Sequence, residues 1–147
     1  SQPEMVSETT PASDVLALMQ IERSKLKLVV DNHGELSGLI HLDHLSDQAI
    51  MRRVAQGDER REIKVADLMR PRERIKALAW QQLQHCTIAD VLNTLQSSGE
   101  QHCVVVDRES HHIRGVISAQ DIAKRLHLPV HFRQAPTFLT LFDSINA

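Results

Sequence analysis

Apolar and polar positions along the first part of the chain predict a helix, two strands and a second helix. Residues 12–23 carry apolar side chains at helical spacing, which predicts a helix. Residues 26–30 and 36–40 are short apolar runs separated by the Asn-His-Gly sequence of residues 32–34, and this pattern predicts two strands joined by a tight turn. A second helix is expected from residue 42 toward residue 54.

The second part of the chain predicts the same order of elements. They are a helix over residues 88–96 that ends at 97–99, a strand over 102–106, a turn over 107–112, a strand over 113–117 and a helix over 118–126. A repeated succession of elements indicates an internal duplication.

Direct alignment of the two parts supports this interpretation. At an offset of 76, residues 12–31 and 88–107 are identical at seven of twenty positions. After one inserted residue the offset becomes 77, and Leu36–Ile40 aligns with Ile113–Ile117. We therefore predict a first repeat over residues 1–54 and a second repeat over 77–128, with a basic linker and lead-in over 55–76 and a tail over 129–147.

Length and charge limit the classes of protein to consider. The 147 residues suit one compact domain or two small repeats packed together. The net charge of −2 argues against a strongly basic nucleic-acid binder. It conceals a basic segment, because residues 52–76 hold nine Lys and Arg and five acids. That segment is either a solvated linker or an anion-facing patch beside a ligand site.

Other classes are excluded by what the sequence lacks. It has no apolar run of the roughly 20 residues that span a bilayer and no signal-peptide pattern. Two cysteines are too few for a disulfide framework, so we expect a reducing, cytoplasmic environment. We find no P-loop, dinucleotide-binding glycine motif or catalytic triad motif, and we expect no enzyme activity.

Several short sequences in the two repeats carry a family resemblance. They are Val65-Ala-Asp-Leu-Met-Arg-Pro-Arg72, Thr87-Ile-Ala-Asp-Val-Leu92, Val104-Val-Val-Asp107 and Gly115-Val-Ile-Ser-Ala-Gln-Asp-Ile122. Their order and duplication over about residues 5–128 resemble a tandem pair of CBS domains (cystathionine β-synthase type), called a Bateman module. The resemblance implies an α/β fold of two pseudo-symmetric repeats, each a small β-sheet with flanking helices, packed through their sheets.

The same resemblance implies a function. Such modules regulate without catalysing a reaction, bind AMP, ADP, ATP or S-adenosylmethionine in clefts between the repeats, and pair into homodimers. We therefore expect an adenine-nucleotide ligand, no required cofactor and an unidentified regulated protein. The alternative is a ligand-free scaffold that mediates dimerisation or protein–protein interaction.

The family's ligand motif, Gly-apolar-x-Ser/Thr-x-x-Asp, is present in the second repeat as Gly115 to Asp121. Ser118 can cap the following helix or donate to a phosphate, and free backbone N–H groups there would favour an anion. Asp121 lies one turn further and can accept both ribose hydroxyls. The alternative is that Ser-x-x-Asp is an ordinary helix N-terminus.

The resemblance assigns contacts with the base to the opposite repeat. The residues at those positions are Thr9, Thr10, Ala12, Ser24 and Lys25. Because a residue before proline avoids the α region, the segment before Pro11 is expected to be extended and to leave backbone groups free to bind an adenine edge. Without the resemblance, this segment would be a plain helix-capping run.

The first repeat departs from the motif. His41 and His44 stand at the Ser/Thr and Asp positions, and imidazole cannot replace an anionic acceptor of two hydroxyls. We expect this second cleft, with Thr87 and Ala89 opposite, to be empty or altered, and at most one nucleotide per chain. The histidine pair lacks a third metal ligand in the local sequence, so we expect no metal site.

Three further features complete the candidates. Arg70, Arg72 and Arg74 could reach phosphates or could lie in a solvated loop. The cysteines, Cys86 and Cys103, are not expected to be nucleophiles. In the tail, an amphipathic stripe is predicted at Phe138, Leu141, Phe142 and Ile145, which would pack on the module, across a dimer or on a partner.

Overall fold

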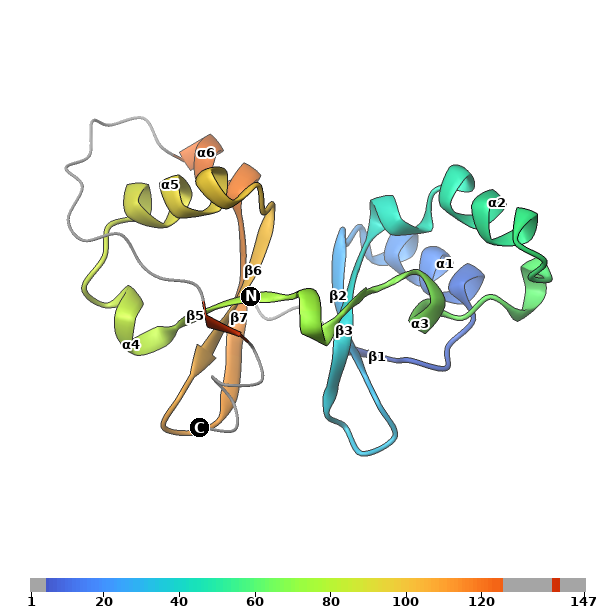
Figure 1. The fold of residues 1–147 in the computed structure, drawn as a ribbon, viewed down its shortest axis with the longest axis horizontal. Helices are drawn as coiled ribbons and strands as arrows, with labels where there is room; N and C mark the ends of the chain where they lie inside the picture. Colours follow the sequence, from blue (N-terminus) through green and yellow to red (C-terminus); the bar gives the residue numbers. More distant parts are fainter. Residues whose placement is uncertain (1–4, 126–138, 141–147) are drawn as a thin grey trace. The chain divides into compact units, whose positions relative to one another are not determined.

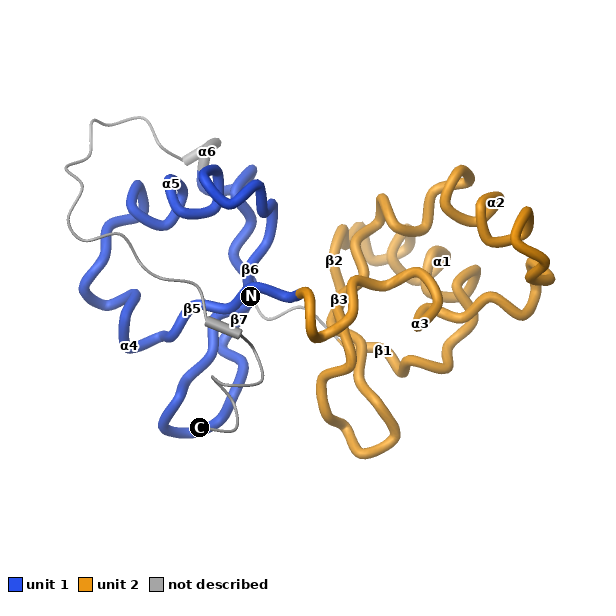
Figure 2. The backbone as a smooth tube through the Cα atoms, in the orientation of Figure 1, with its two compact units in different colours: residues 1–2, 75–147 blue, residues 3–74 orange. Residues whose placement is uncertain are grey.

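The computed structural model describes the backbone of residues 5–125 and 139–140 and the side chains of residues 5–122. The chain forms two compact units, residues 3–74 and residues 75–147, the second of which includes residues 1–2 (Figure 2). We call them the first unit and the second unit and describe each by itself.

The first unit is a four-stranded sheet with helices on one side (Figure 1). Its elements are β1 (Met5–Ser7), α1 (Ala12–Glu22), β2 (Leu26–Val30), β3 (Leu36–His41), the 3-10 helix η1 (Leu42–Leu45), α2 (Asp47–Ala55), η2 (Arg60–Glu62), α3 (Val65–Leu68), β4 (Arg70–Pro71) and η3 (Arg72–Arg74). The strand order is β1-β2-β3-β4, with β1 parallel to β2 and the other pairs antiparallel.

The second unit repeats this plan. Its elements are β5 (Lys76–Ala79), α4 (Trp80–Leu83), α5 (Ile88–Ser98), β6 (His102–Asp107), β7 (His112–Ser118), α6 (Ala119–Arg125) and β8 (Leu139–Thr140). The strand order is β7-β6-β5-β8, with β5 parallel to β6 and the other pairs antiparallel. The succession β5-α5-β6-β7 therefore corresponds to β1-α1-β2-β3, and the predicted α/β fold of two repeats is confirmed.

The correspondence extends to an irregularity in pairing and stops at the fourth strand. The register between the hairpin strands shifts at Val29/Val30 in the first unit and at Val105/Val106 in the second, which are equivalent positions. The fourth strand lies on opposite edges, because β4 pairs with β3 whereas β8 pairs with β5. The duplicated part is thus one parallel β-α-β unit extended by a hairpin.

The predicted helices and strands agree with the structure, with one difference after β3. The single helix expected over residues 42–54 is two helices, η1 and α2. Ser46 separates them, because its backbone is extended and its Oγ accepts a hydrogen bond from the Ala49 backbone N–H at 3.2 Å. A serine that caps a new helix thus ends the short helix before it.

The segment expected to be a basic linker, residues 55–76, is part of the first unit as far as residue 74. Ile63 and Val65 are buried in the core of that unit. Ion pairs join it to α2: Asp58 Oδ2 lies 2.6 Å from Arg53 Nε, and Arg60 contacts Asp47 at 3.7 Å. Burial of two apolar residues explains why this segment packs rather than extends into solvent.

Each unit has an apolar core between its helices and its sheet. The first core contains Val6, Ala12, Val15, Met19, Val29, Ile40, Leu45, Ile50, Ile63 and Val65. The second contains Leu78, Val91, Leu95 and Cys103, with Leu83, Ile117, Ala119 and Ile122 packed against it. The apolar residues of the predicted tail stripe, Phe138, Leu141, Phe142 and Ile145, lie outside the described residues.

Candidate functional site

The corner between β7 and α6 carries the two residues of the predicted ligand motif. Ser118 is the last residue of β7, and its Oγ accepts a hydrogen bond from the Asp121 backbone N–H at 3.3 Å. The Ala119 N–H donates to the Gln101 carbonyl at 2.8 Å. Two of the backbone donors expected to be free for a phosphate are therefore engaged. The Asp121 side chain is exposed, and its carboxylate can accept hydroxyl groups.

The equivalent corner of the first unit, between β3 and η1, holds two imidazoles instead. His41 Nδ1 accepts a hydrogen bond from the Asp43 backbone N–H, and His44 Nδ1 accepts one from the His41 backbone N–H, both at 3.0 Å. The two rings are edge-to-face with centroids 6.2 Å apart. This is a capping box in which imidazole nitrogens take the place of the usual oxygens.

The environment of His44 favours its neutral form. Burial lowers the pKa of His44, and the nearby His41 and Arg70 lower it further, while Asp43 acts in the opposite direction. Among the described residues, no group of three or more His, Cys, Asp or Glu could hold a metal ion. The two histidines thus act as structural caps in this corner.

The residues predicted to contact the base begin with the turn between β1 and α1. The Thr10 N–H donates to the Ser7 carbonyl at 3.0 Å, and the Thr10 carbonyl accepts from the Val65 N–H at 2.8 Å. Ala12 is buried, and its N–H donates to the Ile63 carbonyl at 2.9 Å. The Thr10 backbone groups, which we expected to be free to bind an adenine edge, are therefore engaged by Ser7 and by Val65 at the start of α3.

Side chains at the other predicted base-contact positions differ in exposure. Thr9 is exposed, and its Oγ1 lies 3.0 Å from the Ser7 Oγ. Ser24 follows α1, and its Oγ is buried without a hydrogen-bond partner among the described residues. Lys25 is exposed, and its carbonyl accepts from the Leu42 N–H at 2.9 Å. Of these three side chains, those of Thr9 and Lys25 are exposed.

Thr87 and Ala89, assigned to the altered second cleft, lie at the start of α5. Thr87 Oγ1 accepts from the Asp90 N–H at 3.1 Å, and Asp90 Oδ2 accepts from the Thr87 N–H at 3.0 Å. Ala89 and Asp90 are buried. Sequence reasoning missed this role of Asp90, although Thr-x-x-Asp before an apolar run is the signal of a capping box.

The three arginines considered for phosphate contacts lie in different surroundings. Arg70 lies on β4 opposite Leu39 and lowers the pKa of His44, whereas Arg72 lowers the pKa of Asp31. The main cause of the low Asp31 pKa is its hydrogen bond from the Glu35 N–H. Arg74 is exposed. Arg70 therefore influences a histidine that follows β3, and Arg72 influences an aspartate that precedes β3.

Neither cysteine is activated. Burial raises the pKa of the Cys103 thiol to about 12, with a smaller contribution from Glu100. The pKa of the Cys86 thiol is also raised, by burial and by Asp90, and its Sγ–H donates to the Gln82 carbonyl at 3.2 Å. A nucleophilic cysteine needs a lowered pKa, so these contacts support the expectation that neither is a nucleophile.

Sequence reasoning missed a polar cluster around Asp107, at the start of the turn between β6 and β7. Gln81 Nε2 donates to Asp107 Oδ1 at 2.8 Å, and Arg114 Nη1 lies 3.3 Å from Asp107 Oδ2. The Arg114 guanidinium also stacks over the Trp80 ring, 4.0 Å from its centroid. The hydrogen bond from Gln81 is the main reason that the pKa of Asp107 falls to about 2.

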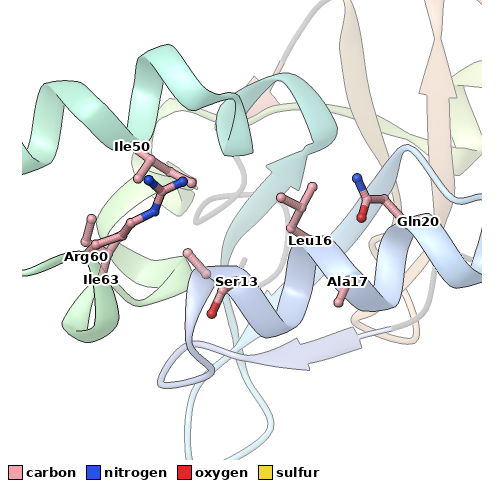
Figure 3. Close-up of a pocket in the computed structure, with 8 residues that line it drawn as sticks. Ser13, Leu16, Ala17, Gln20, Ile50, Arg60 and Ile63 are labelled. Atoms are coloured by element: carbon pink, nitrogen blue, oxygen red, sulfur yellow. The ribbon is translucent and has the colours of Figure 1, made fainter.

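A hollow of about 130 Å³ lies within the first unit, among α1, α2 and η2 (Figure 3). It is lined by Ala12, Ser13, Leu16, Ala17, Gln20, Ile50, Arg60 and Ile63. Ligand pockets are usually about 300–1,000 Å³. The hollow is therefore large enough for a side chain but too small for a nucleotide.

Comparisons with solved structures agree with this fold. A conserved CBS domain protein of unknown function from Thermoplasma acidophilum is 20% identical, with a TM-score of 0.62; the match covers 84% of this chain and 64% of that one. The chain thus spans just under two thirds of that protein. CBSX2 in complex with AMP is 17% identical, with a TM-score of 0.60 and coverage of 84% and 86%.

A third solved structure, a CBS-domain containing protein from Agrobacterium tumefaciens, is 15% identical, with a TM-score of 0.63 and coverage of 85% of both chains. No curated protein matches the sequence. In the described part of the chain, no helix is long and apolar enough to cross a membrane. The family model for the CBS domain matches residues 1–49 and 84–128, which fall on the two repeats. Because these segments make up more than half of the sequence, the chain belongs to the CBS-domain family and carries two CBS repeats.

Proposed function

We propose that this chain is a non-catalytic regulatory module that senses an adenosine-containing ligand, either AMP, ADP, ATP or S-adenosylmethionine. CBS domains are regulatory ligand-binding modules, and the similar structure of CBSX2 holds AMP. The observation that carries the proposal for this chain is the exposed Asp121 carboxylate one turn after Ser118, in the corner that ends β7.

In this proposal, Asp121 accepts hydrogen bonds from the two ribose hydroxyls. A carboxylate has acceptor positions for both, and such charge-assisted bonds are stronger than neutral ones. Ser118 is committed to the helix cap through its acceptor lone pair, but its hydroxyl proton remains available to donate to a ligand. The corner therefore offers one anionic acceptor and one hydroxyl donor.

The base contacts are proposed for side chains of the first repeat, as the family resemblance implies. Because the backbone of Thr10 is engaged, we assign this role to Thr9, Ser24 and Lys25. The Ser24 Oγ is the best supported of the three, since a buried hydroxyl without a partner is unfavourable until another group bonds to it.

Thermal unfolding of the whole chain with each of the four ligands tests the proposal. A ligand at 100 times its dissociation constant stabilises by about 2.7 kcal/mol, which raises Tm by several degrees. Asp121→Ala is expected to abolish this rise. Asp43→Ala, which removes an exposed carboxylate from the equivalent corner of the first unit, is the matched control and should keep it. The proposal fails if no adenosine compound raises the Tm of the wild type.

A second proposal concerns self-association and rests on α1. The outer side of this helix carries two large apolar side chains among polar ones, because Ile21 is 80% exposed and Leu18 is 37% exposed. At the equivalent positions of α5 the chain has Thr94 and Ser97. The two helices are thus built for different surroundings.

We propose that the outer face of α1 packs against α1 of a second copy in a homodimer. Asp14 lies in the first turn of the helix and Arg23 just beyond its last residue, and both are exposed. Two antiparallel copies would place each Asp14 near the partner's Arg23, which gives charge complementarity at both ends. This face would also serve the alternative role of the chain as a scaffold.

Light scattering or sedimentation of the wild type and two variants tests the dimer. Ile21→Ser, which reproduces the serine of α5, should raise the dimer dissociation constant at least tenfold, because each copy loses a buried apolar side chain. Ile88→Ser, at an exposed isoleucine of the second unit, is the control. A monomeric wild type at high concentration contradicts self-association and would leave a different protein as the partner of α1.

A further inference from the structure

The corner between β3 and η1 contains two histidines that each accept a backbone hydrogen bond through Nδ1. His41 Nδ1 and His44 Nδ1 each accept a hydrogen bond from a backbone N–H at 3.0 Å, the first from Asp43 and the second from His41. A ring nitrogen can accept only while it carries no proton. Both hydrogen bonds therefore require an Nδ1 atom that carries no proton.

The groups that face these rings make the two histidines respond differently to protonation. The Asp43 carboxylate Oδ2 lies only 3.3 Å from His41 Nδ1, so a protonated His41 can donate to the carboxylate of the residue whose N–H it previously accepted. His44 is half-buried and faces His41 from β3 and Arg70 from β4, while Asp43 is the one acid that favours its charge. If His41 already carries a proton, a proton on His44 therefore lies near two positively charged groups, His41 and Arg70.

We propose that His41 and His44 form a proton-operated latch, which closes the corner after β3 when both rings are neutral and releases it when His44 binds a proton. Each protonation takes one proton from solvent and removes one acceptor from the capping box. Release would free the His41 N–H and loosen η1, whose Leu45 is buried in the first core. The inference does not depend on the proposed nucleotide ligand.

The second repeat provides an internal contrast. At the position equivalent to His41, Ser118 caps α6 with a hydroxyl, which does not titrate near neutral pH. The position equivalent to His44 is Asp121, which is exposed. Proton-linked opening is thus expected in the first unit and not in the corner of the second unit.

The direction of the pH effect follows from the lowered pKa of His44. An unfolded chain protonates this histidine near its ordinary value of 6.5, whereas the folded corner resists protonation. The contribution to stability is therefore complete above pH 6.5 and is lost as the pH falls below that value.

The decisive variant is the double substitution His41→Ser with His44→Gln, which restores the conventional Ser-x-x-Gln capping box without titratable rings. Thermal unfolding of the whole chain is measured from pH 8 to pH 5. Between pH 7 and pH 5, the wild type is expected to lose more of its Tm than the double variant. His33→Gln, at an exposed histidine in the turn between β2 and β3, should behave as the wild type.

Nuclear magnetic resonance of the wild type tests the latch without any substitution. The His44 ring is expected to titrate below pH 6.5, and the backbone amide signals of His41 and Asp43 should shift with the same midpoint. The inference is overturned if His44 titrates at or above 6.5, or if those two amides do not follow it. An equal loss of Tm in the wild type and the double variant would also overturn it.

Discussion

The corner after β3 and the corner after β7 are built on the same backbone plan and carry opposite chemistry. In the second unit, Ser118 caps the helix and leaves the Asp121 carboxylate exposed. In the first unit, the His41 ring nitrogen accepts from the Asp43 backbone N–H, and the His44 ring nitrogen accepts from the His41 backbone N–H. One corner thus presents an acceptor to solvent, and the other uses its acceptors internally.

This difference shows that the duplicated backbone determines where the corner side chains lie but not which interactions they make. The hairpins share their register shift at equivalent positions, so the fold tolerates either set of residues at the corner. Ligand binding and proton sensitivity can therefore be divided between the repeats. Substitutions at matched positions provide the means to test how far the two units have diverged.

The largest divergence in stability is expected at the buried Lys27. Its Nζ lies 2.5 Å from Glu22 Oε2, and Lys27 is 1% exposed whereas Glu22 is 31% exposed. The equivalent residue of the second unit is Cys103, which is uncharged at neutral pH. The first unit thus holds an ion pair where the second holds a small apolar residue.

Glu22→Ala should lower the free energy of unfolding by about 3 kcal/mol, because it removes the carboxylate that pairs with a buried ammonium. Lys27→Met, which removes the charge and keeps an apolar stem, should cost less than about 1 kcal/mol. Denaturant unfolding of both variants measures the difference. A Lys27→Met variant less stable than Glu22→Ala would show that the pair itself stabilises the fold.

The next effect distinguishes the glycines of the two hairpins. A Cβ on Gly38 would meet the Arg70 carbonyl oxygen at 2.5 Å and the Met69 Sδ at 2.6 Å, because β4 packs closely beside β3. At Gly115, the equivalent position, no described atom lies within 4 Å of such a Cβ. Position 38 therefore requires glycine because β4 covers this edge of the first sheet. Position 115 of the second sheet is not restricted in this way.

Gly38→Ala should destabilise the chain by about 2 kcal/mol, since the clash involves backbone. Gly115→Ala should change stability by less than about 0.5 kcal/mol. Chemical denaturation of the two variants under identical conditions is the measurement. Equal losses at both positions would contradict the different packing of the two edges.

The smallest expected effect concerns the aspartates that open the two hairpin turns. Asp31 accepts two backbone N–H groups, whereas Asp107 also accepts the Gln81 side chain, and its pKa falls to about 2. Gln81→Leu should raise the pKa of Asp107 toward its ordinary 3.8, because the main hydrogen bond is lost.

The consequence for acid stability has a definite sign. A lowered carboxyl pKa stabilises the fold above pH 3.8, and this contribution disappears as the pH falls toward about 2. The Gln81→Leu variant should therefore be less sensitive to acid over that range. Titration of the side-chain carboxyls by nuclear magnetic resonance is the check, with an unchanged Asp31 as the internal control.

The parts of the fold that could be predicted are those with strong local signals. The helix at residues 12–23 and the strands at 26–30 and 36–40 follow from apolar spacing and from an Asn-His-Gly turn, and the structure confirms them. The strands β1 and β4 were not predicted, because two or three residues carry no periodicity. They form through pairing with strands distant in sequence.

Residues of the candidate site could be proposed from the sequence, but not all of their hydrogen bonds could. The motif from Gly115 to Asp121 was found through the family resemblance, and the helix cap formed by Ser118 followed from its place before the helix. The engagement of the Thr10 backbone could not be predicted, since it depends on Val65, 55 residues away in sequence. Long-range backbone pairing decides which polar groups remain for a ligand, and no local pattern records it.

Calorimetric titration of the whole chain with AMP, ADP, ATP and S-adenosylmethionine tests the central claim that the two corners differ in ligand chemistry. One adenosine ligand per chain is predicted for the wild type and none for Asp121→Ala. Two equal sites per chain would contradict the account, because the imidazoles of the first corner would then serve as well as Asp121. Unchanged binding by Asp121→Ala, or no binding of any of these ligands by the wild type, would contradict it equally.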